Sequence, residues 1–591
     1  MGLFKVRNIG TRPKNLPPGP PTKWLLGNLL QMPREKAYLQ FKKWADEYGP
    51  IYTLILGTQT TIVLTDAEIV KDLLDKRSGI YSSRPEAYLS RVASKGLRMA
   101  GMFYGDQWRR ARKILHSILN RTSSLSFRPY QDLETMSLLA AILDDADADA
   151  KAPLSSATTE AEAAGGHQSR HHLFDHFRRT SHSLATSIFY GFRIQDPSDP
   201  RLLQMYQNLQ HFSDLSGGAQ ASAAALLLDV YPVLRRPWFQ QWLPIYKHAV
   251  AVGEKTSEFF WGLWMPAKQK VLLSNGKMSH SQQQPCFAVS MVKAQQQEEQ
   301  EQGQGQGKGT GIITDEEAAF IIGNAGLEAG SDTMSSTLAA FIMGVVMYPE
   351  VGKRLQECVD EFTSTDGPGS SSTCRMLTIE DVQDPRAQYV RACVKEALRW
   401  MPTGILGLPH AVVRDDEYRG YKILKDSSVV LNIWGINTDG NRYKDPHTFN
   451  PDRFIHDTQT SSQAALNPNV AERDHYTFGA GRRICQGLHV ADDFLFLGIA
   501  RLMWAFNFDR AINPQTGKEI VPDRLDLIGG LMVQPAPFKM NITPRSEKRA
   551  QMVRDAWKEC QETKLDGEMQ WKSVLNEMYR VFPSMSEVKA A

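Results

Sequence analysis

Residues 478–487, which read FGAGRRICQG, constrain the fold of this chain more than any other stretch. They place Cys485 in a glycine-rich loop directly before a segment whose apolar residues recur every three or four positions, the spacing of a buried helix face. A thiol at a helix N-terminus meets the positive end of the helix dipole and unpaired backbone N–H groups, and both favour the metal-binding thiolate. Glycines let the loop turn sharply and lie close to a flat ligand, while Arg483 can meet an anionic group of that ligand. The stretch therefore predicts a cysteine metal ligand at the start of a helix.

This loop resembles the haem-binding signature F-x-x-G-x-R-x-C-x-G of the cytochrome P-450 haem-thiolate monooxygenases. The matching positions are Phe478, Gly481, Arg483, Cys485 and Gly487. The resemblance implies that these residues bind haem b and that Cys485 is the axial ligand, whose thiolate favours O–O cleavage. The alternative is a buried free cysteine in a glycine-rich turn. Family members often carry Pro after the cysteine; Gln486 stands there instead, which would loosen the loop or add a hydrogen bond near the sulfur.

Composition limits the other classes of site. The six cysteines are scattered without a C-x-x-C pair, so neither a zinc site nor a disulfide framework is expected, and a reducing compartment is the default. The net charge of +3 argues neither for nor against nucleic acid. No nucleic-acid partner is expected. The 12 Trp and 25 Phe residues suit a protein that encloses a large apolar ligand.

The N-terminal region holds four basic residues within positions 1–15 and no apolar run, so no transmembrane anchor is seen. LPPGPP at 16–21 is a stiff extended segment, either an ordinary linker or, by the resemblance, the hinge that follows a membrane helix in the family. We expect a basic segment and hinge at 1–21, a single haem-thiolate domain at 22–545, and a charged helical extension at 546–591.

Two further motifs concern the haem propionates. GDQWRRARKILH at 105–116 predicts a helix that places Trp108 and Arg112 on one face, four residues apart. An exposed basic helix with a packed Trp would show the same pattern. The resemblance implies that Trp108 and Arg112 bind a propionate, since a buried carboxylate needs a charged partner. It also implies a propionate contact for His410, in GLPH.

A long helix is predicted from a capping box at 314–317 to about Met347, before Pro349. Its middle reads AGSDT at 329–333, and Gly330 in a helix interior costs about 1 kcal/mol relative to Ala. A helix–helix crossing at a small residue would explain Gly330. The family has a similar motif on the helix that crosses the distal haem face. That resemblance implies that Gly330 opens space for oxygen, and that Thr333 and Asp332 are catalytic groups of proton delivery.

Glu396 and Arg399 lie three residues apart in a predicted helix that ends before Pro402. Such pairs are common on surfaces and contribute little. In the family, however, E-x-x-R forms a buried network with the Arg of a downstream segment, here Arg453 in FNPDRF at 449–454. The resemblance therefore implies that Glu396, Arg399 and Arg453 hold the cysteine loop in place.

Several segments carry coarser expectations. Residues 49–65 predict a hairpin, and residues 419–434 alternate like strands. Low-complexity insertions are expected at about 144–172 and 276–311, the second as a disordered loop. Pocket residues between 83 and 104, near 405–408 and near 529–533 are expected to be apolar and unspecific. Trp238, Phe239 and Trp242 beside Arg235 and Arg236 suit either a membrane interface or a buried loop between helices.

Together these motifs predict a mostly α fold with small β-sheets and the haem between the long distal helix and the helix after the cysteine loop. The resemblance is strongest to filamentous-fungal members of secondary metabolism. It implies insertion of one oxygen atom from O2 into a lipophilic substrate, with electrons from NADPH through a partner reductase, on the cytosolic face of the endoplasmic reticulum membrane. A peripheral or cytoplasmic location is the alternative.

Two other functions stay open: a reductase-independent haem-thiolate enzyme (peroxide-using, isomerase or dehydratase) and a non-catalytic haem-binding protein. The intact Asp332–Thr333 pair argues against the first of these.

Overall fold

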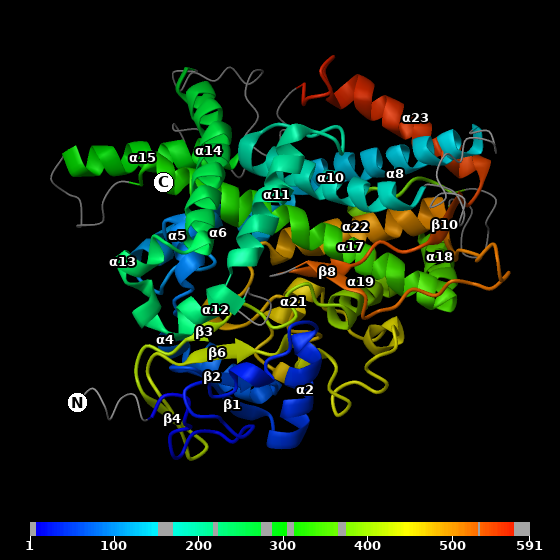
Figure 1. The fold of residues 1–591 in the computed structure, drawn as a ribbon. Helices are drawn as coiled ribbons and strands as arrows, with labels where there is room; N and C mark the ends of the chain where they lie inside the picture. Colours follow the sequence, from blue (N-terminus) through cyan, green and yellow to red (C-terminus); the bar gives the residue numbers. More distant parts are fainter. Residues whose placement is uncertain are drawn as a thin grey trace.

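The computed structural model describes residues 8–151, 169–216, 223–273, 286–303, 313–364, 374–529 and 532–572. Within these ranges the chain is mostly helical with small sheets, so the expected fold class is confirmed; the largest sheet lies at one end, and β8 and β10 lie among the helices (Figure 1). Helices occupy the upper part of the view, and β1, β2, β6 and α2 form the lower part.

The largest sheet among the described residues has the strand order β1-β2-β6-β3. β1 and β2 form the predicted antiparallel hairpin, and β6 runs parallel to β2 and joins it across more than 350 residues of sequence. The strands of this sheet are β1 (Ile51–Leu56), β2 (Gln59–Leu64), β6 (Ser428–Leu431) and β3 (His410–Ala411). The remaining strands pair in twos: β4 (Asp416–Tyr418) with β5 (Tyr421–Ile423), β7 (Phe506–Arg510) with β10 (Met540–Pro544), and β8 (Leu527–Gly529) with β9 (Val533–Pro535).

The α-helices of the first half of the described chain are α2 (Ala37–Tyr48), α3 (Ala67–Val70), α4 (Ser78–Tyr81), α5 (Tyr88–Ser94), α6 (Asp106–Leu119), α7 (Arg121–Ser124), α8 (Arg128–Lys151), α10 (Ser169–Tyr190), α11 (Pro200–Leu215), α12 (Ala223–Val230), α13 (Pro237–Gln240), α14 (Pro244–Leu273) and α15 (Phe287–Gly303). Those of the second half are α16 (Asp315–Phe320), α17 (Ala329–Met347), α18 (Pro349–Thr363), α19 (Gln388–Trp400), α20 (Ile433–Asn437), α21 (Ser461–Ala465), α22 (Leu488–Ala505) and α23 (Glu547–Lys564). Short helical turns of other pitch are η1 (Leu29–Gln31), η2 (Lys71–Lys76), η3 (Leu125–Phe127), η4 (Pro232–Arg235), η5 (Ile321–Glu328), η6 (Ile379–Gln383), η7 (Pro385–Ala387), η8 (Pro451–Phe454), η9 (Val470–Glu472) and η10 (Gly481–Arg483).

The main hydrophobic core lies around α17 and α22, and both helices are buried over most of their length. The predicted capping box is present, since Thr314 and Glu317 cap α16 reciprocally, and α17 ends at Met347 as expected. The sequence pattern did not predict that η5, between α16 and α17, is a π-helix. Such segments widen a helix and are frequent at functional sites.

Two glycines of η5, not Gly330, mark the close helix crossings of this region. A Cβ at Gly323 would lie 2.3 Å from the Phe260 ring, and one at Gly326 would lie 2.6 Å from the Phe189 ring. At Gly330 the added atom would meet only the Ala185 methyl group, at an ordinary 3.5 Å. Packing therefore requires glycine in η5 and not at Gly330.

The expectation of a disordered loop over residues 276–311 is wrong for its middle part. Residues 287–303 form α15, because Phe287, Met291 and Val292 provide an apolar face that is buried against the core. In the other insertion, α8 extends to Lys151 and α10 begins at Ser169. The rest of both segments lies outside the described residues.

The charged C-terminal segment packs on the rest of the chain through α23, which lies beside α8 (Figure 1). Arg545 and Arg549 bind the Asp360 carboxylate at 2.7 and 2.8 Å, and Lys564 contacts Asp132 at 3.1 Å. Beyond α23, Trp571 is buried with its ring 4.5 Å from that of Tyr130.

No single helix of the described chain has the length and apolar character needed to cross a membrane. One strongly bent helix pair, Asp315–Met347 with Pro349–Thr363, meets the criterion by length and composition. Most residues of α17, within that pair, are buried in the protein.

Candidate active site

The cysteine loop is built from hydrogen bonds that hold its backbone against other elements. Gly481 adopts a left-handed φ of 65°, and a Cβ there would lie 2.2 Å from the Leu74 carbonyl oxygen, so only glycine fits. The Cys485 amide donates to the Phe478 carbonyl at 2.9 Å. Gln486 donates to the Arg112 carbonyl at 2.9 Å, so this residue ties the loop to α6. Gln486 was expected either to loosen the loop or to add a hydrogen bond near the sulfur. In the structure it forms a hydrogen bond, and this bond goes to α6.

The Cys485 side chain lies in a recess. It is solvent-accessible, yet burial raises the pKa of its thiol, while the Gly487 amide and the Arg112 charge lower that pKa less strongly. A group that is accessible and still surrounded by protein lines an internal hollow. The position of Cys485 before a helix predicted a lowered thiol pKa. The structure shows that burial raises this pKa by more than the neighbouring amide and cation lower it. A bound metal ion reverses this balance, because its positive charge stabilises the thiolate.

Three arginines converge beside this recess without a carboxylate. Arg84 donates to the carbonyls of Ala100 and Leu408 at 2.9 and 2.6 Å, and Arg112 donates to the Ile484 carbonyl at 2.7 Å. No ion pair of Arg84, Arg112 or Arg483 occurs within the described ranges. Burial, followed by the charge of its neighbours Arg84 and Arg112, lowers the pKa of Arg483 to about 8. Burial and the charge of Arg112 lower that of Arg84 to about 9.

Trp108 lies against the same cluster. The Arg483 guanidinium lies 4.1 Å from the centre of its ring, and the Arg112 guanidinium lies 5.5 Å from it. Trp108 is buried, and no hydrogen bond from its indole N–H occurs within the part of the chain that the structure covers. The cluster therefore presents an indole donor and three cations to one region.

His410 is also buried beside this cluster. Its Nδ1 lies 2.8 Å from the Tyr81 carbonyl oxygen and donates to it. Burial, then the charges of Arg84 and Arg483, lower the pKa of His410 to about 3. The neutral imidazole then carries no proton on Nε2 and cannot donate there to an anion. A propionate contact from Nε2 would require the imidazolium, which only a bound anion would stabilise.

The AGSDT segment forms the start of α17. Ala329 is exposed, while its neighbours Glu328 and Ser331 are buried. The Thr333 hydroxyl donates to the Ala329 carbonyl at 2.8 Å, which leaves its oxygen free to accept another hydrogen bond. Burial raises the pKa of Asp332, and the nearby charge of Arg178 opposes that rise. Asp332 is therefore a carboxyl group that holds a proton at higher pH than an exposed aspartate.

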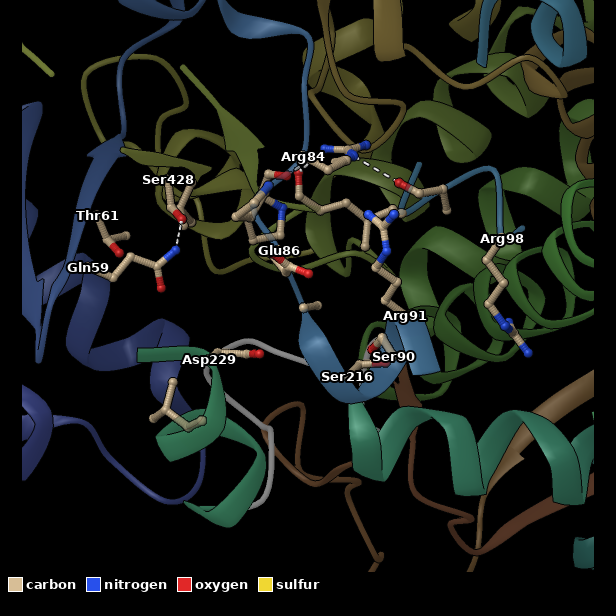
Figure 2. Close-up of a pocket in the computed structure, with 18 of the residues that line it drawn as sticks. Gln59, Thr61, Arg84, Glu86, Ser90, Arg91, Arg98, Ser216, Asp229 and Ser428 are labelled. Carbon is tan, nitrogen blue, oxygen red and sulfur yellow. Dashed lines mark hydrogen bonds between the residues drawn. The ribbon is translucent and has the colours of Figure 1, made fainter. Parts of the chain in front are cut away.

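A cavity of about 980 Å³ extends from the cationic cluster to the largest sheet (Figure 2). Its lining includes Arg84 and Met102, and the Met102 carbonyl accepts from Arg483 at 2.6 Å. The expectation that the stretch between residues 83 and 104 is apolar is wrong, because it gives this cavity Arg84, Arg91 and Arg98.

Arg98 connects the cavity wall to η5 through a buried ion pair. Its guanidinium binds both carboxylate oxygens of Glu328, at 2.5 and 2.9 Å, and lies 3.6 Å from the centre of the Phe212 ring. Asn324 donates to the same carboxylate at 2.9 Å. The sequence analysis did not single out Arg84 and Arg98, because neither belongs to a local motif. The only indication in the sequence was a basic residue within a mostly apolar stretch.

Glu396, Arg399 and Arg453 meet in space as the sequence motifs predicted. Glu396 receives Arg399 at 2.6 Å and Arg453 at 3.2 Å, and both Glu396 and Arg399 are fully buried. Arg399 also donates to the Asn437 carbonyl at 2.7 Å. Asn437 in turn accepts from the Tyr476 amide at 3.1 Å, two residues before Phe478. A continuous set of hydrogen bonds therefore runs from Glu396 to the start of the cysteine loop.

The residues present fit a flat, metal-bearing group with two carboxylates. The accessible Cys485 supplies a soft metal ligand, and the three unpaired arginines with the Trp108 indole supply donors for anions. Gly487 has an ordinary φ of −82°, and a Cβ there would meet no protein atom within 4 Å. Glycine at this position is thus not required by the protein's own packing.

Comparison with known proteins gives a family and several close relatives. The family model described as Cytochrome P450 matches residues 17–542. Cytochrome P450 monooxygenase fsoB of Humicola fuscoatra is 42% identical, with 97% of this chain and 94% of the relative covered. Cytochrome P450 monooxygenase virE of Hypocrea virens is 40% identical, with 97% and 93% covered. Cytochrome P450 monooxygenase fogE of Aspergillus ruber is 38% identical, with 97% and 95% covered.

We predict that Arg399→Ala destabilises the protein by about 3–5 kcal/mol, because Glu396 would keep a buried charge without its main partner. The measurements are soluble yield and the free energy of unfolding in urea. Arg109→Ala is the matched control: Arg109 and Asp106 form an ion pair at the same three-residue spacing, but on the surface. The control should change little, since exposed pairs contribute little. If the Arg399→Ala protein unfolds at the same urea concentration as the wild type, the Glu396–Arg399 pair does not contribute to stability as predicted.

Proposed function

The chain belongs to the cytochrome P450 family and is an oxygen-incorporating oxidoreductase, and we propose that it inserts one oxygen atom from O2 into a lipophilic organic substrate. Its cofactor is haem b with a cysteine thiolate as axial ligand. Electrons are proposed to come from NADPH through a partner reductase. The bound haem supplies the activation of O2; the side chains of this chain position the cofactor, the substrate and the protons.

The observation that carries the assignment of residues is the recess at Cys485 with unpaired cations beside it. Cys485 is the proposed axial ligand, and Arg112, Arg483 and the Trp108 indole are the proposed propionate partners. We add Arg84, whose lowered pKa shows the same shortage of negative charge. Two carboxylates at this position would offset the mutual repulsion of the guanidinium groups. His410 joins them only as the imidazolium.

Proton delivery is assigned to Asp332 and Thr333. The raised pKa of Asp332 suits a group that takes a proton from the solvent side and releases it again. The Thr333 hydroxyl donates to the Ala329 carbonyl, so its oxygen can accept from a water molecule that passes the proton on. Arg178 lies near enough to Asp332 to oppose the rise in its pKa and limits how strongly the proton is held.

The substrate is proposed to be a lipophilic intermediate of fungal secondary metabolism. Two observations support this proposal. The residues of the sequence motifs resemble those of filamentous-fungal members of the family, and the chain is 38–42% identical to the three fungal relatives. The cavity of about 980 Å³, whose lining is mostly apolar, has room for a substrate larger than a simple ring system.

A peripheral membrane contact is proposed for the turn around α13. Trp238 and Trp242 are 64% and 76% exposed, so the alternative of a buried loop between helices does not hold for them. Exposed Trp beside the cationic Arg236 is typical of a surface that rests on lipid headgroups. Location at the endoplasmic reticulum remains an expectation from the family.

The ligand assignment predicts that Cys485→Ser loses the strongly red-shifted Soret band of the reduced, carbon monoxide-bound haem. The hydroxyl of serine is a poor replacement for a thiolate in electron donation to iron. Cys560→Ser, at a buried cysteine on α23, is the control and should keep the band. A red-shifted band retained in Cys485→Ser would show that another residue is the ligand.

The proton-delivery assignment predicts that Thr333→Ala keeps haem binding while more NADPH electrons end in hydrogen peroxide. The measurement is peroxide released per NADPH in the presence of reductase, and Thr333→Ser should restore the wild-type ratio. Thr337→Ala is the matched control, because Thr337 makes the same hydrogen bond to the Thr333 carbonyl, at 2.9 Å, one turn later. An unchanged ratio in Thr333→Ala would refute the role, and an absence of NADPH use in the wild type would favour the reductase-independent alternative.

The membrane proposal predicts partial sedimentation of the chain with anionic liposomes at low salt, weakened by added salt. Replacing Trp238 and Trp242 with Ser should release the protein and leave the haem spectrum intact. Trp261→Ser, at a Trp that is 44% exposed on α14, is the control. Wild-type protein that stays wholly in the supernatant at low salt would contradict the proposal.

A further inference from the structure

One wall of the cavity carries three neutral polar side chains in apolar surroundings. Gln59 and Thr61 lie two residues apart on β2 and therefore face the same side, and Ser428 pairs with Thr61 across the parallel β2–β6 register. Figure 2 shows Gln59, Thr61 and Ser428 together at one side of the cavity and Arg98 at the other. We call Gln59, Thr61 and Ser428 the sheet triad.

Apolar side chains of the sheet and of the neighbouring helices adjoin the sheet triad. Leu54 and Leu56 face Thr61 and Gln59 on β1, and all of these residues line the cavity. Phe41 and Leu226 belong to the same hydrophobic cluster and complete the lining. Polar groups in such a setting cost free energy unless they find hydrogen-bond partners.

The triad has unused hydrogen-bonding capacity. The Gln59 amide donates to the Ser428 hydroxyl oxygen at 2.6 Å, which leaves the Gln59 carbonyl oxygen as an acceptor and the Ser428 hydroxyl hydrogen as a donor. Thr61 is 5% exposed, and no partner of its hydroxyl occurs among the residues described. The three side chains can therefore both donate to and accept from one ligand group.

A charged ligand group does not fit this position. None of the three side chains carries a charge, and the adjoining strand residues Leu54, Leu56 and Val430 are apolar; the charged lining residues Arg34, Glu86 and Asp229 lie outside the triad. An ion held by the triad alone would lose its hydration without gaining an opposite charge. At the other side of the cavity, the Arg98 charge is already balanced by Glu328, with side chains only 5% and 3% exposed.

We propose that the sheet triad binds the neutral, oxygen-bearing end of an elongated lipophilic substrate, a hydroxyl or carbonyl group, and so leaves the apolar end in the rest of the cavity, which reaches Arg84 and Asn324 of η5. This inference rests on the proposed function, because it concerns the substrate of that oxygenation. It narrows the substrate class to molecules that already carry a neutral polar oxygen at one end. Such an oxygen must come from a preceding synthetic or oxidation step.

The test is equilibrium dialysis of the haem-loaded full chain against three 12-carbon probes below their micelle concentrations: 1-dodecanol, dodecanoate and dodecyltrimethylammonium. Gln59→Met combined with Ser428→Ala removes both partners of one hydrogen bond together, and Thr61→Val keeps the side-chain shape. We expect the double variant to bind 1-dodecanol about tenfold more weakly and Thr61→Val about threefold more weakly, the loss of one or two net hydrogen bonds. Binding of the two charged probes should change little.

Thr60→Val is the matched control, because Thr60 lies between Gln59 and Thr61 on the opposite face of β2 and does not line the cavity. Equal 1-dodecanol affinity in wild type and both cavity variants would overturn the proposal. So would tighter binding of dodecanoate than of 1-dodecanol, which would point to the arginines instead. Dialysis measures binding and does not depend on turnover. Unchanged 1-dodecanol binding in the variants would therefore refute the role of the sheet triad even if the carbon monoxide band and NADPH use support the proposed function. Conversely, weaker binding in the variants without that band or NADPH use would refute the proposed function alone.

Discussion

The buried Glu396–Arg399 pair is the interaction on which the position of the cysteine loop depends. Neither charge reaches solvent. Glu396 is compensated by Arg399, by Arg453 and by the Asn450 amide, and Arg399 by Glu396 and by backbone carbonyls from distant parts of the chain. Through Asn437 the pair fixes the backbone at Tyr476, and the loop begins two residues later. Charges of this kind add little net stability compared with an apolar core, but they tolerate only one arrangement of their partners. We propose that their role here is to specify where the Cys485 loop lies.

A second constraint is destabilising. Arg84, Arg112 and Arg483 lie close together, and no carboxylate pairs with them among the residues that the structure describes. Burial lowers the pKa values of all three, and repulsion from neighbouring guanidinium groups lowers those of Arg84 and Arg483 further, so the protein alone is less stable there than it would be with an anion present. Any ligand that binds only the folded chain adds to its stability. In the proposed assignment, the cationic cluster therefore couples cofactor binding to the stability of the fold.

Sequence reasoning predicted the features that short motifs define: the hairpin at β1 and β2, the Thr314 capping box, and the meeting of Glu396 with Arg453. It failed where the outcome depends on contacts between distant segments. The periodic pattern around η5 does not distinguish a π-helix from an α-helix, and the close packing of Gly323 and Gly326 against the Phe260 and Phe189 rings involves residues far away in the sequence. Arg84 and Arg98 likewise gain meaning only once the fold places them against Leu408 and Glu328.

The same arginines connect the cofactor region to the substrate cavity. Arg483 holds the carbonyls of Ser82 and Met102, and Arg84 holds that of Ala100, so the segment between these residues is fastened to the cysteine loop. That segment also provides Arg98, which is locked to Glu328 directly before Ala329. If these arginines bind the propionates as proposed, a change in charge there alters the hydrogen bonds that shape the cavity wall. Substrate fit and cofactor binding are consequently linked through one set of guanidinium groups, while the sheet triad, built on β2 and β6, stays outside that set.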